Sequence, residues 1–294
     1  MSHAPLHIAA EEGYFADRNL DVEFVRLGRH QEVMAALAQG NVDVATGLLT
    51  VNELNLIAGG ARIRLVAAMG EVSPDHCPHM AFMIRREHLE SGATADPERI
   101  RRFRVDVDIL SPFGYWLHEL LKPRGMTLET LDLVDLPSPT AVDAMARGSI
   151  DVVVDSEPWV SMHTASDDVA IWKPVGELLP GYVFNMVMYG PDLLDERPEV
   201  GERFATAVLQ GIRQYNRGKT GRNLAIVQAA TGLSAEQVAT SCWAKMRVDA
   251  RIDPSVFRGY QEWLLARGLV ERMIADEELV DQRFIDHGND VLAR

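Results

Sequence analysis

Apolar and charged residues alternate over residues 20–25, a spacing that predicts a strand with one buried face. A loop and a helix follow, and Gly40 is placed to end that helix in the left-handed conformation that glycine adopts easily. The β-branched segment 42–44 then predicts a second strand. Upstream, residues 5–12 have a helical pattern closed by Gly13, so the order is helix, strand, helix, strand.

The same order recurs further along the chain. Residues 113–122 predict a helix, residues 131–136 a strand, and Ser138 is placed to cap a second helix. Segments 36–44 and 144–152 share the pattern A-x-A-x-G-x-[VI]-D-V at the end of this unit. Because strands that alternate with helices favour parallel sheets, the repeat predicts an α/β protein with two lobes, each a parallel-type sheet flanked by helices.

The second copy of the repeat begins with an additional strand, over residues 104–109. Its counterpart in the first copy would precede Met1. We therefore expect a strand to be missing from the first lobe, either because translation begins further upstream or because the chain has been trimmed. A leader peptide would then have been lost with that strand.

Two extended apolar stretches, 80–85 and 182–189, are candidates for hinge strands between the lobes. With the chain crossing between lobes at these two stretches, we predict that lobe 1 comprises residues 1–82 and 190–294 and that lobe 2 comprises residues 83–189. The residues after the second crossing follow a helical period, which predicts a helical C-terminal tail packed around lobe 1.

The formal charge of −14 over 294 residues argues against nucleic acid as a partner, because nucleic acids reward clustered Lys and Arg. The sequence contains no apolar run of about eighteen residues, which predicts a chain that does not span a membrane. A small molecule is the expected partner, and the chain is expected to be a monomer. Taken as written, the sequence predicts a cytoplasmic protein; with a truncated N-terminus it predicts a periplasmic or cell-envelope protein.

Two cysteines, Cys77 and Cys242, are too few for a disulfide framework but allow a single bridge. Segment 75–79 (Asp-His-Cys-Pro-His) suggests metal ligands. However, zinc ligands come as spaced pairs, and Cys242 lies far away in a helical stretch with no histidine near it in sequence. We therefore predict no metal site and no cofactor.

Several short motifs, in this order, resemble those of the nitrate, sulfonate, taurine and thiamine-precursor substrate-binding proteins of ABC importers. The motifs are His3-Ala4-Pro5-Leu6-His7-Ile8-Ala9, Glu12-Gly13-Tyr14-Phe15, Leu20-Asp21-Val22, the two repeat segments and Glu157-Pro158-Trp159. The resemblance implies a type II periplasmic-binding-protein-like fold, a ligand held between two lobes that close about the hinge, and an ABC permease as partner.

Ligands of open α/β sheets lie beyond the carboxyl ends of strands, where loops lead into helix N-termini. The candidate ligand-binding residues are those of such loops: His3, Ala4, Thr46, Gly47, His79, Ser111, Phe113, Tyr115, Glu157, Trp159, Tyr182 and Asn185. A carboxylate beside aromatic rings suits a planar or nitrogen-containing ligand. The alternative is that Trp159 and Phe113 belong to the core and that Glu157 satisfies a helix dipole.

The second hypothesis is an enzyme on the same fold, such as a decarboxylase, or one like the thiamine-pyrimidine synthase or the sulfinate-cleaving desulfinase. The synthase uses a Lys and a His that the matching stretch 46–55 lacks, and the desulfinase uses a cysteine where this chain has Ser2-His3-Ala4. His3 has no identifiable orienting partner, so we assign no catalytic residue.

Overall fold

The computed structural model describes residues 2–28 and 30–294. The chain divides into two compact units. Unit 1 comprises residues 1–71, 183–239 and 245–294, and unit 2 comprises residues 72–182 and 240–244. The two copies of the A-x-A-x-G repeat therefore lie in different units.

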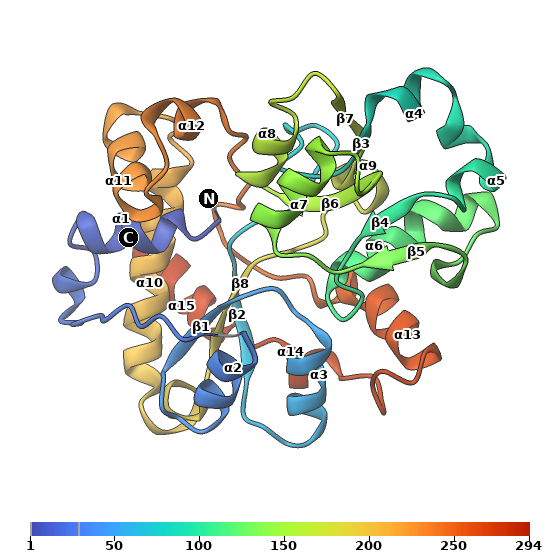
Figure 1. Cartoon of the computed structure of the whole chain (residues 1–294). Helices are drawn as coiled ribbons and strands as arrows, with labels where there is room; N and C mark the ends of the chain where they lie inside the picture. The colour runs from blue at the N-terminus through green and yellow to red at the C-terminus, as the bar shows by residue number, and fades with distance from the viewer. Residues whose placement is uncertain (1, 29) are drawn as a thin grey trace. The chain divides into compact units, whose positions relative to one another are not determined.

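Unit 1 is built on a sheet of three strands in the order β1-β8-β2 (Figure 1). These are β1 (Val44–Gly47), β2 (Arg64–Ala68) and β8 (Met186–Tyr189), and β8 runs antiparallel to both neighbours. The helices of this part of the chain are α1 (Ala4–Glu11), α2 (His30–Ala38), α3 (Val51–Ala58), α10 (Pro198–Tyr215), α11 (Gly221–Thr231), α12 (Ala235–Thr240), α13 (Arg258–Ala266), α14 (Asp276–Leu279) and α15 (Arg283–Leu292), with the short turns η1 (Ala16–Arg18), η5 (Asp192–Glu196) and η6 (Pro254–Phe257).

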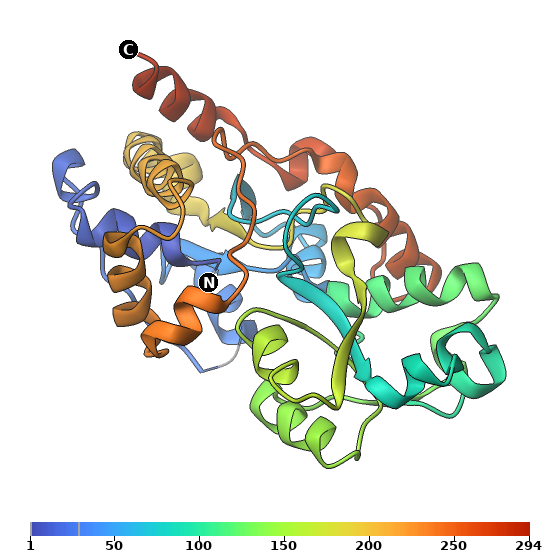
Figure 2. The ribbon, with the colours of Figure 1, turned by 90° about the horizontal axis from the view of Figure 1, so that it is seen from above.

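Helix α10 is the centre of the helical layer of unit 1. It packs against α1 on one side and against α15 on another (Figure 1 and Figure 2). Gly211 allows the first contact, since a Cβ atom at this position would lie 2.2 Å from the carbonyl oxygen of Pro5. The predicted helical tail is thus present, and its last helix, α15, covers α10.

Unit 2 contains a sheet of five strands in the order β5-β4-β6-β3-β7 (Figure 1). The strands are β3 (Met80–Arg85), β4 (Arg104–Asp106), β5 (Asp132–Val134), β6 (Val152–Ser156) and β7 (Val169–Pro174). The helices are α4 (Arg86–Glu90), α5 (Pro97–Ile100), α6 (Pro112–Leu121), α7 (Ser138–Ala146), α8 (Trp159–His163) and α9 (Val175–Leu178), with the turns η2 (Ala93–Ala95), η3 (Lys122–Arg124) and η4 (Leu128–Thr130). Met83 and Val153 of the sheet form a buried core with Ala141 and Met145 of α7.

The predicted α/β class, with two sheets flanked by helices, is confirmed, but neither sheet is all parallel: the strand pairs of the unit 1 sheet are antiparallel, and the unit 2 sheet is mixed. Strand β4 runs parallel to β5 and β6, whereas β3 runs antiparallel to β6 and β7. The antiparallel members, β3 and β8, are the two stretches predicted as hinge strands. The predicted boundary at 82/83 falls inside β3, and the one at 189/190 directly follows β8. The observed units instead divide at 71/72 and 182/183.

The strand predicted over residues 20–25 is wrong. These residues are all described and form an irregular segment, with Phe24 and Val25 exposed by 47% and 56%. A strand forms only with a hydrogen-bonding neighbour, and the apolar alternation alone does not supply one. Strand β1, the candidate neighbour in sequence, pairs with β8 alone among the described strands.

Candidate functional site

The candidate residues at the N-terminus of α1 line a cavity of about 200 Å³ in unit 1. Ala4 is buried as the first residue of the helix, whereas His3 precedes it and is exposed. The cavity is also lined by His7 on the next turn of α1 and by residues of α11 such as Thr231. Two imidazoles one helical turn apart therefore face the same small space.

Thr46 and Gly47 end strand β1, close to a histidine that the sequence did not single out. A Cβ atom on Gly47 would lie 3.1 Å from Cε1 of His30, so the ring covers this glycine closely. The Nε2 atom of His30 lies 2.7 Å from a carboxylate oxygen of Glu53. His30 thus has the orienting partner that the sequence does not identify for His3.

Glu53 is fully buried at the start of α3, where it forms a capping box with Thr50. Burial opposes ionisation of this carboxyl, but hydrogen bonds from His30 and Thr50 outweigh burial and hold its pKa below the usual value. Glu53 therefore carries a negative charge directly beside the ring of His30. The T-x-x-E spacing of Thr50 and Glu53 is the sequence signal by which this pair can be found.

Asn185 precedes strand β8 and is 3% exposed. Its backbone carbonyl accepts a hydrogen bond from the N–H of Met69. Its side-chain Nδ2 has no hydrogen-bond partner among the described residues. A buried amide donor left in this way is suited to a polar ligand atom or an ordered water.

In unit 2, three candidates lie at the N-terminus of α6: Ser111 precedes the helix, and Phe113 and Tyr115 lie in its first turn. Ser111 caps α6, since its hydroxyl accepts from the backbone N–H of Phe113 and donates to the carbonyl of Asp108. Phe113 is partly exposed and packs on Trp116 with ring centroids 5.1 Å apart, whereas Tyr115 is buried. Tyr182 is buried and meets Trp116 edge-on at 5.6 Å, so these residues form one aromatic cluster.

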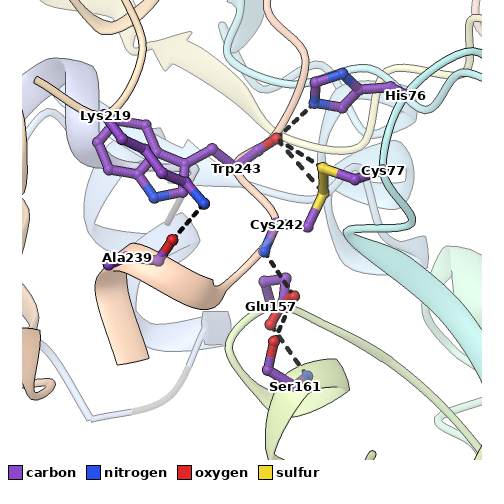
Figure 3. The surroundings of a disulfide bond; sticks show 8 residues. All are labelled: His76, Cys77, Glu157, Ser161, Lys219, Ala239, Cys242 and Trp243. Carbon is purple, nitrogen blue, oxygen red and sulfur yellow. Dashed lines mark hydrogen bonds between the residues drawn. A yellow bond between two sulfur atoms is a disulfide. The ribbon is translucent and has the colours of Figure 1, made fainter. Parts of the chain in front are cut away.

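Glu157 directly follows β6, and its carboxylate already accepts three hydrogen bonds. The donors are the backbone N–H and hydroxyl of Ser161, at 3.2 and 2.8 Å, and the backbone N–H of Cys242, at 2.9 Å (Figure 3). Two oxygens offer about four acceptor sites, so little capacity is left for a ligand. Trp159 begins α8 and is partly exposed, which leaves its indole available for stacking.

Two carboxyls that the sequence analysis did not select lie at the carboxyl ends of parallel neighbours. Asp106 ends β4 and Asp155 lies in β6, and both are buried. Burial raises the pKa of Asp106 to about 6, although the N–H of Leu136 donates to it at 2.9 Å. Burial likewise raises the pKa of Asp155 to about 6, against the opposing hydrogen bonds from Ser138 and Ser156. The sequence signal is an Asp at the end of a strand rich in valine.

His79 is buried at the start of β3, where burial, helped by the charge of His76, lowers its pKa to about 4. Its backbone carbonyl accepts from the N–H of Glu157. Close to it, Cys77 and Cys242 form a disulfide. The single bridge that two cysteines allow is therefore present, and it joins segments 165 residues apart.

The predicted site residues are divided between the units. Unit 1 holds His3, Ala4, Thr46, Gly47 and Asn185, and unit 2 holds His79, Ser111, Phe113, Tyr115, Glu157, Trp159 and Tyr182. Polar groups in these loops lie at helix N-termini and strand ends, which is the arrangement by which α/β proteins bind small ligands.

Solved structures with the same fold include binding components of import systems and a desulfurization enzyme, which gives a TM-score of 0.72 at 15% identity, with 98% of this chain and 96% of the other covered. The ligand-binding component of an ABC-type import system from Staphylococcus aureus, with zinc bound, superposes with a TM-score of 0.77 at 15% identity, covering 97% of this chain and 94% of the other. The alkanesulfonate-binding protein from Xanthomonas axonopodis pv. citri, bound to MOPS, gives a TM-score of 0.70 at 16% identity, with 95% and 94% covered. The chain thus has the predicted periplasmic-binding-protein-like fold.

The chain belongs to the NMT1-like family, whose model matches residues 1–229. It is also similar to the 4-amino-5-hydroxymethyl-2-methylpyrimidine phosphate synthase of Aspergillus parasiticus, with 24% identity over 220 residues. That match covers 70% of this chain and spans 60% of the length of the synthase. The family resemblance stated from the short motifs is confirmed. Among the described residues, no helix is long and apolar enough to cross a membrane.

Proposed function

We propose that this chain is a solute-binding protein that captures a small organic, planar or nitrogen-containing ligand by closure, for an ABC importer. The observation that carries the proposal is the fold, shared almost end to end with binding components of import systems. Within unit 2, the partly exposed rings of Phe113 and Trp159 provide stacking surfaces, and within unit 1 the buried amide of Asn185 provides a hydrogen-bond donor. These groups suit a flat ligand with polar edges.

The experiment is a thermal-shift screen of heterocycles, amines, sulfonates and nitrate, followed by mass spectrometry of the recovered ligand. A solute-binding protein gains stability with ligand, by about 2.7 kcal/mol at a concentration one hundred times Kd, and returns it unchanged. Replacing Trp159 with Ala is expected to weaken binding more than tenfold. The matched control is Trp172→Ala, because Trp172 is also partly exposed in unit 2 but packs under Arg124. Equal affinities of the two variants would contradict the role of Trp159.

A second candidate function is catalysis on the same fold, favoured by the His30–Glu53 pair. A histidine held 2.7 Å from a buried carboxylate beside the Gly47 loop has the geometry of an oriented general base. Similarity to the pyrimidine phosphate synthase points in the same direction. If the natural chain converts the ligand to a product, the chain is an enzyme. The conversion should then be lost in His30→Gln and retained in His287→Gln, which replaces an exposed histidine.

We also propose that the chain works in the cell envelope with an ABC permease as its partner. The Cys77–Cys242 disulfide supports this location, because such bonds persist mainly in oxidising compartments. Fractionation of the native host with an antibody to the chain tests the location. Recovery only with the cytoplasmic fraction would contradict it.

A further inference from the structure

Around the disulfide lies a third group that binds soft metal ions. The Sγ atoms of Cys77 and Cys242 and a ring nitrogen of His76 all lie within 4.8 Å of one another. All three residues belong to unit 2. In the sequence, Cys242 is remote from the 75–79 segment, which argues against a metal site. The fold removes that reason, since Cys242 follows α12 in an irregular segment and lies against Cys77.

We propose that, once the disulfide is reduced, Cys77, Cys242 and His76 bind a thiophilic divalent cation such as Zn²⁺. Two thiolates and one imidazole are a donor set typical of zinc sites, with Zn–S of about 2.3 Å and Zn–N of about 2.0 Å. Sulfurs at tetrahedral positions around such an ion lie roughly 3.8 Å apart. The metal-bound form therefore needs the two sulfurs to separate by only roughly 2 Å from their bonded distance.

The surroundings of the three side chains provide a fourth donor. The carbonyl oxygen of Trp243 lies 2.7 Å from Nε2 of His76, 3.7 Å from Sγ of Cys242 and 4.0 Å from Sγ of Cys77 (Figure 3). All three donor atoms thus already converge on one oxygen. The cation replaces the contact between His76 and this carbonyl, and the carbonyl or a water completes four-coordination.

The loop that carries Cys242 is anchored independently of the disulfide. The backbone N–H of Cys242 donates to the carboxylate of Glu157 at 2.9 Å, and the hydroxyl of Ser161 donates to the same carboxylate. Reduction leaves these hydrogen bonds intact, so Cys242 stays near Cys77. This preorganisation lowers the entropy cost of metal binding.

The two states interconvert by thiol–disulfide exchange. A small thiolate attacks the sulfur of Cys77, which is the more exposed residue of the pair, and Cys242 leaves as a thiolate. A second small thiol then attacks the mixed disulfide, releasing the Cys77 thiolate and the small-molecule disulfide. The protein gains two thiols while two small thiols are oxidised to one disulfide. Binding of the cation then displaces one proton from each cysteine, and two thiolates with a neutral imidazole balance its 2+ charge. Oxidation by a small-molecule disulfide reverses these steps and expels the ion.

The test uses Co²⁺ as a spectroscopic probe with the full-length chain, before and after reduction with a metal-free phosphine. The reduced protein is expected to bind one equivalent with thiolate-to-cobalt charge-transfer absorption and the intense visible bands of a tetrahedral site. Zn²⁺ should bleach both, and addition of oxidised glutathione should release the metal. The disulfide form is expected to show neither band.

Matched variants separate this site from other ligands. His76→Ala is expected to weaken Co²⁺ binding by tenfold or more, whereas His287→Ala, which replaces an exposed histidine of unit 1, should leave it unchanged. Cys77→Ser should abolish the charge-transfer band, with circular dichroism confirming that the variant is folded. A reduced chain that binds no Co²⁺, equal affinity in His76→Ala, or a disulfide that resists reduction in the folded protein would each overturn the proposal. None of these outcomes depends on the organic ligand of the proposed function.

Discussion

Buried ionisable groups decide how single residues of unit 2 respond to pH. Asp106 and Asp155 have raised pKa values because burial penalises their charged forms, and His79 and His163 have pKa values lowered to about 4 for the same reason. Between pH 4 and 6.5, a rise in pH lowers the contribution of the two aspartates to the free energy of unfolding and raises that of the two histidines. Each is therefore best measured as a difference between the natural chain and a variant.

Asp155→Asn is expected to stabilise the protein at neutral pH. The folded-state pKa of Asp155, about 6, exceeds the unfolded value of 3.8. The contribution of this carboxyl to the free energy of unfolding is therefore intact below pH 4 and is lost as the pH rises through 6. The variant avoids this loss, which is about 3 kcal/mol above pH 6. Urea unfolding at pH 4, 5, 6 and 7 measures the difference. The exposed Asp143→Asn is the control, and parallel curves for the two variants would refute the burial argument.

At the scale of single residues, the sequence indicates which residue types lie in the loops, but not which atoms they contact. Ser111 was recognised as lying at a helix N-terminus, and the structure shows it capping α6. Glu157 was selected as a ligand acceptor, but the pattern did not reveal the donors that occupy it. Ser161 lies four residues later and was visible in sequence, whereas Cys242 is brought there by the fold. The ligand-binding roles assigned to these residues stay predictions.

At the scale of elements, local patterns predicted the helices of the repeat and the helical tail, and failed where a strand needed a remote partner. Residues 5–12 and 113–122 form α1 and α6 nearly as expected, because a helix satisfies its hydrogen bonds within one segment. Residues 20–25 have the pattern of a strand but no neighbour to complete it. The antiparallel directions of β3 and β8 depend on sheet order, which the alternation of side chains does not encode.

The contact between α1 and α10 is expected to depend on Gly211. Gly211→Ala places a methyl group 2.2 Å from the carbonyl oxygen of Pro5, and backbone atoms cannot yield as a flexible side chain does. We expect a loss of about 1–3 kcal/mol in the free energy of unfolding. Gly221→Ala, at the start of α11 with no atom within 4 Å, is the control and should be neutral or slightly stabilising. Similar losses in both variants, measured by chemical denaturation, would refute the packing explanation.

At the scale of the whole molecule, the sequence predicted the α/β class and the duplication, but not which segments join each unit. Residues 240–244 lie within the stretch predicted as tail of lobe 1, yet they belong to unit 2, where the disulfide and Glu157 hold them. The deciding contact joins residues 165 positions apart, and no local pattern records a pairing at that distance.

Reduction of the disulfide is expected to lower stability, because the bond restricts the unfolded chain. Closing so long a loop contributes about 2–5 kcal/mol in the chain-entropy description. Thermal unfolding with and without reductant, in the presence of a chelator, measures the difference. Cys77→Ser/Cys242→Ser is the control and should unfold identically in both buffers. An unchanged melting temperature of the natural chain on complete reduction would contradict this expectation.

The disulfide also makes more than half of the polypeptide a covalent ring, since it links positions 77 and 242 of a 294-residue chain. A protease that cuts once inside this ring releases no fragment, whereas a cut before residue 77 or after residue 242 frees a terminal piece. Limited digestion run on paired gels, one with mercaptoethanol and one without, thus distinguishes cuts inside the ring from cuts in the two tails.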